Sequence, residues 1–307
     1  MAICTRNGFT LTELLITFTI IAILAAMSLG ALANVREMGR EAATKATIAK
    51  LNDIIMRRYE SYMHRRVPVD LSGLTPDNAA KDRLYAIRDL MRMEMPDRPL
   101  DITAPPIALP VSGNHIPRPA LSKLYYTYYS GHSTSMSAGA AGKEAIAAEM
   151  LYMVVSMGSP EDMEQFTQSE IGDTDGNGWL EFLDGWGRPI FFLRWAPGYS
   201  QYSDIQVPHP NPTTDDPIGH HDPFDPRRTE EAYKLIPLIY SAGANGRPGL
   251  CIIATDTSGN LFGFASVSGN ICGDPNFAKM GSPSDDNGNG TSTDLHGLIT
   301  NHRIDMR

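Results

Sequence analysis

The chain has 307 residues, a formal net charge of −9 and three cysteines. About 240 residues follow the long N-terminal helix predicted below, enough for one hydrophobic core or two small ones. The acidic balance argues against general nucleic-acid binding, which needs a basic face on the main domain. The sequence has no Gly-x-Ser-x-Gly elbow, P-loop or dinucleotide fingerprint, so it predicts no enzyme.

The N-terminus combines a short polar segment with a long apolar one. Arg6 lies in the polar segment, which ends at Gly8 and Phe9. From Leu14 to Ala33 no residue is charged, and such a run is long enough to cross a bilayer as a helix. Glu13 stands at its head, where a carboxylate costs about 2.5–3.5 kcal/mol if it reaches the bilayer centre. This placement predicts a functional role for Glu13 and a cationic partner, for which the nearest candidate is a new N-terminus at Phe9.

This arrangement resembles the N-terminal signature of type IV prepilins and type II secretion pseudopilins. The match consists of a leader over residues 1–8, then Gly8 and Phe9, then Glu13 and the apolar run. The resemblance implies that prepilin peptidase cuts between Gly8 and Phe9 and methylates the Phe9 amine. It also implies that Glu13 neutralises the Phe9 amine of a neighbouring subunit during assembly. One departure is Gly30, which stands where many members of these families have a proline.

The resemblance further implies where the protein is and what it meets. Its partners would be membrane lipid, an inner-membrane assembly platform, and other copies or homologous pseudopilins in a helical filament. Arg6 would stay cytoplasmic by the positive-inside rule, which places the head on the periplasmic side of the inner membrane after a single pass. Two other interpretations stay open. An ordinary secretory signal peptide would be cut after Ala33, and a plain signal anchor would stay uncut.

Residues 9–33 are thus predicted as a transmembrane helix and residues 34–66 as an amphipathic stalk that continues it. Proline is absent until Pro68. Lys and Arg outnumber Asp and Glu by eight to four between Arg36 and Arg66, which leaves −13 for residues 67–307. Such a basic stalk suits lateral packing of subunits, although a solvated helix face has the same pattern. Apolar residues mark one helical face at Ile48, Leu51, Ile55, Tyr59 and Tyr62.

Residues 67–172 are predicted as a helical and loop-rich insertion. Thr75 is a suitable N-cap for a helix to about Met95, because proline and an acidic residue follow it. A Pro-rich connection covers 96–119, an Ala- and Met-rich buried helix covers 139–157, and Ser159 begins another short helix. A tyrosine cluster predicts a packed surface, with a bound ligand as the alternative, at Tyr125, Tyr126, Tyr128 and Tyr129.

Residues 173–307 are predicted to form a β-rich head. Apolar runs cover 189–195 and 234–240, and two more, at 251–254 and 261–267, flank a hairpin turn. A long N-terminal helix followed by a small antiparallel sheet indicates a pilin-like α+β fold. Within this head, Asp184–Pro189 and Ser241–Gly246 resemble a turn and a loop of major pseudopilins. These matches favour a type II secretion pseudopilin over a type IV pilus subunit for adhesion or motility. A membrane-anchored envelope protein of other function is the second alternative.

The segment 173–184 has the spacing of a calcium loop, with a glycine at the sixth place. Its predicted ligands are the side chains of Asp173, Asp175, Asn177, Glu181 and Asp184 and the carbonyl of Trp179. Asp184 is shorter than the usual final Glu and could belong to the next turn, and a solvated acidic turn is the alternative for the whole segment.

Two further features come from the C-terminal half. The resemblance to major pseudopilins implies a second calcium site formed by Asn245, Asp286 and Asp294, for which a disordered acidic loop is the alternative. Cys4 lies in the leader, so Cys251 and Cys272 remain as an even pair in an exported chain. They could form a disulfide or remain two buried thiols.

Overall fold

A computed structural model of the protein describes residues 10–136, 145–206, 221–229, 234–246, 249–250 and 297–303. Several predicted features lie outside these residues. They are Gly8, Phe9, Cys251, Cys272, Asp286, Asp294 and the hairpin between 251 and 267.

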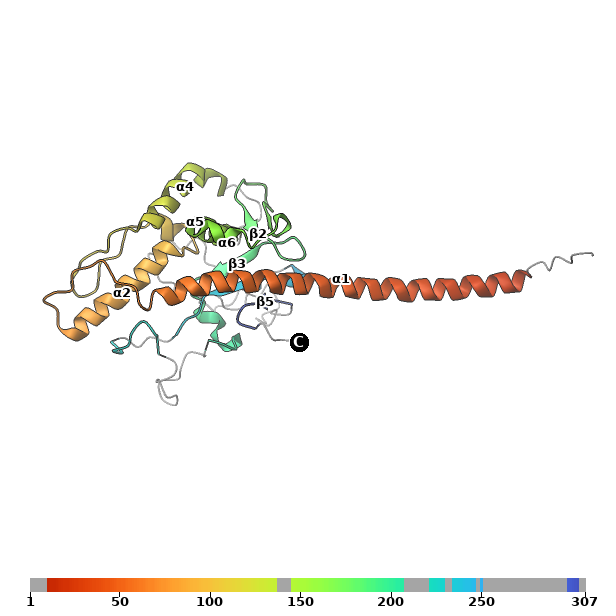
Figure 1. The fold of residues 1–307 in the computed structure, drawn as a ribbon, viewed down its shortest axis with the longest axis horizontal. Coiled ribbons are helices and arrows are strands. Elements are labelled where there is room, and N and C mark those ends of the chain that lie inside the picture. The colour runs from red at the N-terminus through yellow and green to blue at the C-terminus, as the bar shows by residue number, and fades with distance from the viewer. Residues whose placement is uncertain are drawn as a thin grey trace, which may run out of the picture.

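Helix α1 (Leu11–Ser61) is a single helix of 51 residues, about 76 Å long, and it continues unbroken through Gly30. Its N-terminal half projects from the head, a name used from here on for all described residues after α1. Its C-terminal half packs on this head (Figure 1). The predicted apolar face is confirmed, since Ile48, Leu51 and Tyr59 are all buried. In the described part of the chain, α1 is the helix long and apolar enough to cross a membrane.

The helices after α1 gather mainly at the end of the head that lies away from the projecting half of α1 (Figure 1). They are α2 (Pro76–Glu94), α3 (Pro99–Thr103), α4 (Ala120–Met136), α5 (Ala145–Gly158) and α6 (Pro160–Met163). Thr75 caps α2 by accepting a hydrogen bond from the Asn78 amide, as the sequence predicts. The short helix α3 lies inside the Pro-rich connection, where no helix was expected.

Within the described residues, the strands form two small antiparallel sheets. After the 3-10 turn η1 (Gln168–Glu170), strand β1 (Ile171–Gly172) pairs with β2 (Glu181–Phe182). The second sheet has the order β3 (Ile190–Leu193), β4 (Leu238–Ser241) and β5 (Ile299–Thr300). The 3-10 turns η2 (Pro197–Tyr202) and η3 (Gly243–Asn245) follow β3 and β4. These elements confirm the α+β, pilin-like arrangement that the sequence predicts.

Both faces of the β3–β4 pair are buried. Successive side chains in a strand point to opposite faces, and all four residues of each strand are buried. Phe192 and Ile239 join the larger core, together with Leu51 of α1 and Val154 of α5. On the other face, Phe191 and Tyr240 stack with ring centroids 5.3 Å apart in a smaller core. The apolar sequence of β3 follows from this double burial.

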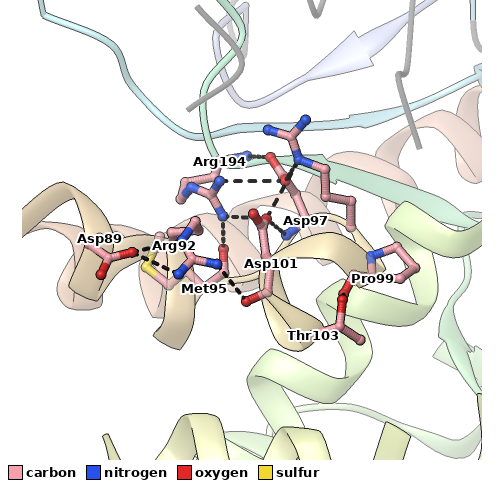
Figure 2. A network of polar contacts seen from close by, with 9 residues as sticks. Asp89, Arg92, Met95, Asp97, Pro99, Asp101, Thr103 and Arg194 are labelled. Atoms are coloured by element: carbon pink, nitrogen blue, oxygen red, sulfur yellow. Dashed lines mark hydrogen bonds and ion pairs between the residues drawn. The ribbon is translucent and has the colours of Figure 1, made fainter. Parts of the chain in front are cut away.

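A buried network of charges joins the helical insertion to the sheet (Figure 2). Arg194, directly after β3, donates to the Asp101 carboxylate at 2.8 Å and to the Met95 carbonyl at 2.8 Å. Arg92 of α2 donates to Asp89 at 2.8 Å and to the Asp101 carbonyl at 3.0 Å. These partners hold α2, α3 and β3 together in a region that excludes water.

Candidate functional site

The start of α1 forms a reciprocal cap around Glu13. The Thr10 amide and hydroxyl both donate to Glu13 Oε2 at 2.8 Å, and the Glu13 amide donates to Thr10 Oγ1 at 3.2 Å. Within the described residues, no ion pair includes Glu13. The carboxylate is therefore placed at the beginning of the helix, and its Oε1 atom is open to a donor from outside the chain.

The projecting half of α1 is apolar around its circumference and exposed. A soluble helix would bury one apolar stripe, whereas a helix that is apolar all round needs lipid or other helices around it. The large exposed side chains are Leu11, Leu14, Leu15, Ile16, Phe18, Ile20, Ile21, Ile23, Leu24, Met27, Leu29, Leu32 and Val35. This half of α1 is consistent with a membrane anchor.

The turn after β2 docks on the middle of α1. The Gly185 amide donates to Thr44 Oγ1 at 2.9 Å, and Trp186 Nε1 donates to Glu37 Oε1 at 3.0 Å. A Cβ atom on Gly185 would lie 2.2 Å from the Arg40 carbonyl oxygen, so the close approach requires glycine. The turn thus fixes the point at which α1 leaves the head.

The segments Asp184–Pro189 and Ser241–Gly246 meet at this turn. Asp184 Oδ1 accepts from the Trp186 amide at 2.8 Å, and its Oδ2 accepts from Ser241 Oγ at 2.6 Å. Arg188 donates to the Ala244 carbonyl at 3.1 Å across the same contact. Asp184 therefore belongs to the turn after β2, which is the alternative that the sequence offers to a role as the last calcium ligand. Asn245 ends η3 nearby, but its predicted companions lie outside the described residues.

An acidic cluster lies where α5 packs on β2. One carboxylate oxygen each from Glu149, Asp175 and Glu181 lies within 4.8 Å of the other two. Asp175 and Glu181 belong to the predicted calcium loop, whereas Glu149 comes from α5 and was not predicted. The sequence does single out Glu149, because it is the sole charged residue of the otherwise apolar helix α5.

The cluster is electrostatically costly. Burial raises the pKa of Glu149 to about 7, and the charge of Asp175 adds to the rise, while a hydrogen bond from Asn177 opposes it. Burial also raises the pKa of Glu181 to about 7, against a hydrogen bond from the Thr174 amide. Asn177 Nδ2 donates to Glu149 Oε1 at 2.6 Å and to Asp175 Oδ2 at 3.0 Å. Glu149 Oε2 is buried, and no described residue forms a hydrogen bond with it.

Hydrogen bonds from backbone amides of the loop hold the Asp173 side chain. Asp173 accepts from the amides of Gly176 and Gly178 at 2.7 and 2.8 Å. The Trp179 side chain is buried, and its ring centroid lies 4.9 Å from that of Tyr128 on α4. The structure therefore brings Asp175, Asn177 and Glu181 together with Glu149. Asp173 turns toward the loop amides, and Asp184 lies in the turn after β2.

Comparison with known proteins identifies one segment. Residues 4–29 match the family described as the prokaryotic N-terminal methylation motif. No curated protein and no solved structure matches the chain. The matched segment contains the end of the predicted leader, the expected cleavage point and Glu13, and it runs into the exposed half of α1. It supports a type IV pilin-like protein that is a substrate of prepilin peptidase.

Proposed function

We propose that the chain is a structural subunit of a type II secretion pseudopilus, processed by prepilin peptidase and assembled through α1. The observation that carries this proposal is the methylation motif at residues 4–29, which continues into a helix with one exposed apolar half and one half docked on the head. The subunit would be anchored in the inner membrane with its head on the periplasmic side. Its work is assembly, and the proposal assigns it no catalysis.

Assembly follows from the cost of an unpaired carboxylate in an apolar bundle. Removal of the leader gives Phe9 a charged amine four residues before Glu13. When the apolar halves of neighbouring α1 helices pack together, Glu13 loses contact with water, and pairing with a neighbouring Phe9 amine offsets the loss. Since Thr10 occupies Oε2, Oε1 is the atom that such an amine would meet. One axial stagger of subunits satisfies both charges, so the pair sets the register.

The choice of a secretion pseudopilus over a type IV pilus rests on the head. The segment Asp184–Pro189 and the loop Ser241–Gly246 resemble corresponding segments of major pseudopilins, and here they contact each other through Asp184 and Ser241. Through Gly185 and Trp186 the same unit holds α1. These two segments contact each other where α1 leaves the head. This contact favours a subunit of a secretion pseudopilus over a subunit of a type IV pilus.

Replacement of Glu13 tests the proposal. Glu13→Ala leaves the cleavage point and the head contacts unchanged, so we expect a chain that is processed and stable in the membrane but absent from filaments. The measurement is the share of the protein recovered with sheared or cross-linked filaments. Glu60→Ala is the matched control, because Glu60 is exposed on the same helix, and it should assemble normally.

Two results would count against this account. Normal assembly of Glu13→Ala would remove the role given to the carboxylate. Long fibres on the cell surface, with protein export intact in a strain lacking the subunit, would indicate a pilus for adhesion or motility. The secretion proposal expects a short periplasmic filament and loss of export in that strain.

A further inference from the structure

The acidic cluster is a feature that filament assembly does not explain. It lies in the head at the contact of α5 with the β1–β2 hairpin, away from the projecting half of α1. Glu149 and Glu181 are 1% and 0% exposed, and Asp175 is half-buried. Buried carboxylates are normally paired with a cation or held by several donors. Within the described residues, no ion pair compensates any of these three carboxylates.

The hydrogen bonds to the cluster come from neutral donors and do not compensate its negative charge. Asn177 supplies two donors from one neutral amide group, and the Thr174 amide donates to Glu181 at 2.9 Å. Glu149 Oε2 is buried, yet it has no hydrogen-bond partner among the residues that the structure describes. An unpartnered buried oxygen beside two other carboxylates is expensive in a protein interior, so this group needs a positive charge that the described side chains do not provide.

The donor set fits a hard divalent cation. The candidate ligand atoms are carboxylate oxygens, with no sulfur or imidazole among them, which is the preference of calcium and magnesium. Calcium suits the cluster better, because it accepts an irregular set of six to eight oxygens, whereas magnesium demands near-ideal octahedral geometry. The loop around Asp175 can add further oxygens from Asn177 and from the Trp179 carbonyl.

We propose that Glu149, Asp175 and Glu181 form a calcium site that clamps α5 to the β1–β2 hairpin. The ion would compensate three carboxylates supplied by a helix, a loop and a strand, so it would stabilise a contact between segments 28 residues apart in the chain. Glu149 distinguishes this site from a self-contained loop, because it makes α5 part of the coordination. The site acts on the stability of the head and does not depend on the type of filament.

The test uses the purified full-length protein in detergent micelles, first stripped with EDTA. Calcium chloride is added, and binding is measured by calorimetry and thermal unfolding by circular dichroism. We expect calcium to raise the unfolding temperature of the wild type. Glu149→Gln should weaken calcium binding by about tenfold or more, because it removes a charged ligand. In EDTA, Glu149→Gln should unfold at the same temperature as the wild type or higher, because it relieves the repulsion in the cluster.

Two further variants complete the test. Asp175→Ala, at a half-buried position, should lower stability in calcium and have little effect in EDTA. Glu161→Gln is the matched control, because Glu161 is exposed on α6, and it should bind calcium like the wild type. A purely structural role of the carboxylates predicts equal losses with and without calcium. That result, or a wild type whose unfolding temperature does not respond to millimolar calcium, would overturn the proposal.

Discussion

Glu170 links the segment before β1 to the buried face of α1. It accepts hydrogen bonds from Thr47 at 2.7 Å and from Lys50 at 2.8 Å. Burial alone would raise the pKa of Glu170, but the hydrogen bonds from Lys50, Thr167 and Thr47 outweigh it and lower the pKa to about 2. The ionised carboxylate therefore stabilises the docking of α1, and the protonated form does so less.

The sign of the pH dependence follows from this lowered pKa. The contribution of Glu170 should be fully present above its unfolded pKa of 4.5 and lost as the pH falls toward about 2. Glu170→Gln should lower stability at neutral pH by about 1 kcal/mol, since Lys50 is partly exposed. Unfolding temperatures measured across this range should converge for variant and wild type near the lower limit. Glu164→Gln, an exposed neighbour, should show no such convergence, and a constant gap for Glu170→Gln would contradict the assignment.

At the scale of elements, long periodic segments could be predicted and short strands could not. The spacing of Ile48, Leu51 and Ile55 was sufficient to place the buried face of α1. Strands β1, β2 and β5 have two residues each, too few for an alternating pattern. Strand β5 also pairs with β4, which is distant in the sequence. The sequence does not predict helix α4, because the tyrosines within it indicate an aromatic cluster rather than a helix.

The docking of the turn after β2 on α1 can be tested through Gly185. Gly185→Ala places a Cβ atom against the Arg40 carbonyl, and backbone on both sides leaves no flexible group to move. We expect a loss of about 1–3 kcal/mol in the free energy of unfolding, as for other overpacked contacts. Gly131→Ala is the control, because that glycine lies in α4 with nothing within 4 Å of the added atom. It should be neutral or stabilising, and an equally neutral Gly185→Ala would contradict the close contact.

The whole molecule divides into an apolar rod, which is the projecting N-terminal half of α1, and an acidic head. Composition and charge were enough to predict this division, because they change along the chain in long blocks. The contacts that complete the sites were beyond the sequence. Asp184 meets Ser241 across 57 residues, and Glu149 meets the β1–β2 loop across 28. Such pairs depend on how α5 and the sheet pack, and no local spacing encodes that packing.

If this rod is a processed filament helix, its N-terminus must carry the mark of processing. The measurement is the intact mass and the N-terminal residue of the membrane-extracted protein. We expect a chain that begins at Phe9 with a methylated amine. A chain that begins at Asn34 would instead be a secreted protein with an ordinary signal peptide. A chain that begins at Met1, from a cell containing prepilin peptidase, would be a simple anchor. Either of the last two results would contradict the account and remove the role given to Glu13.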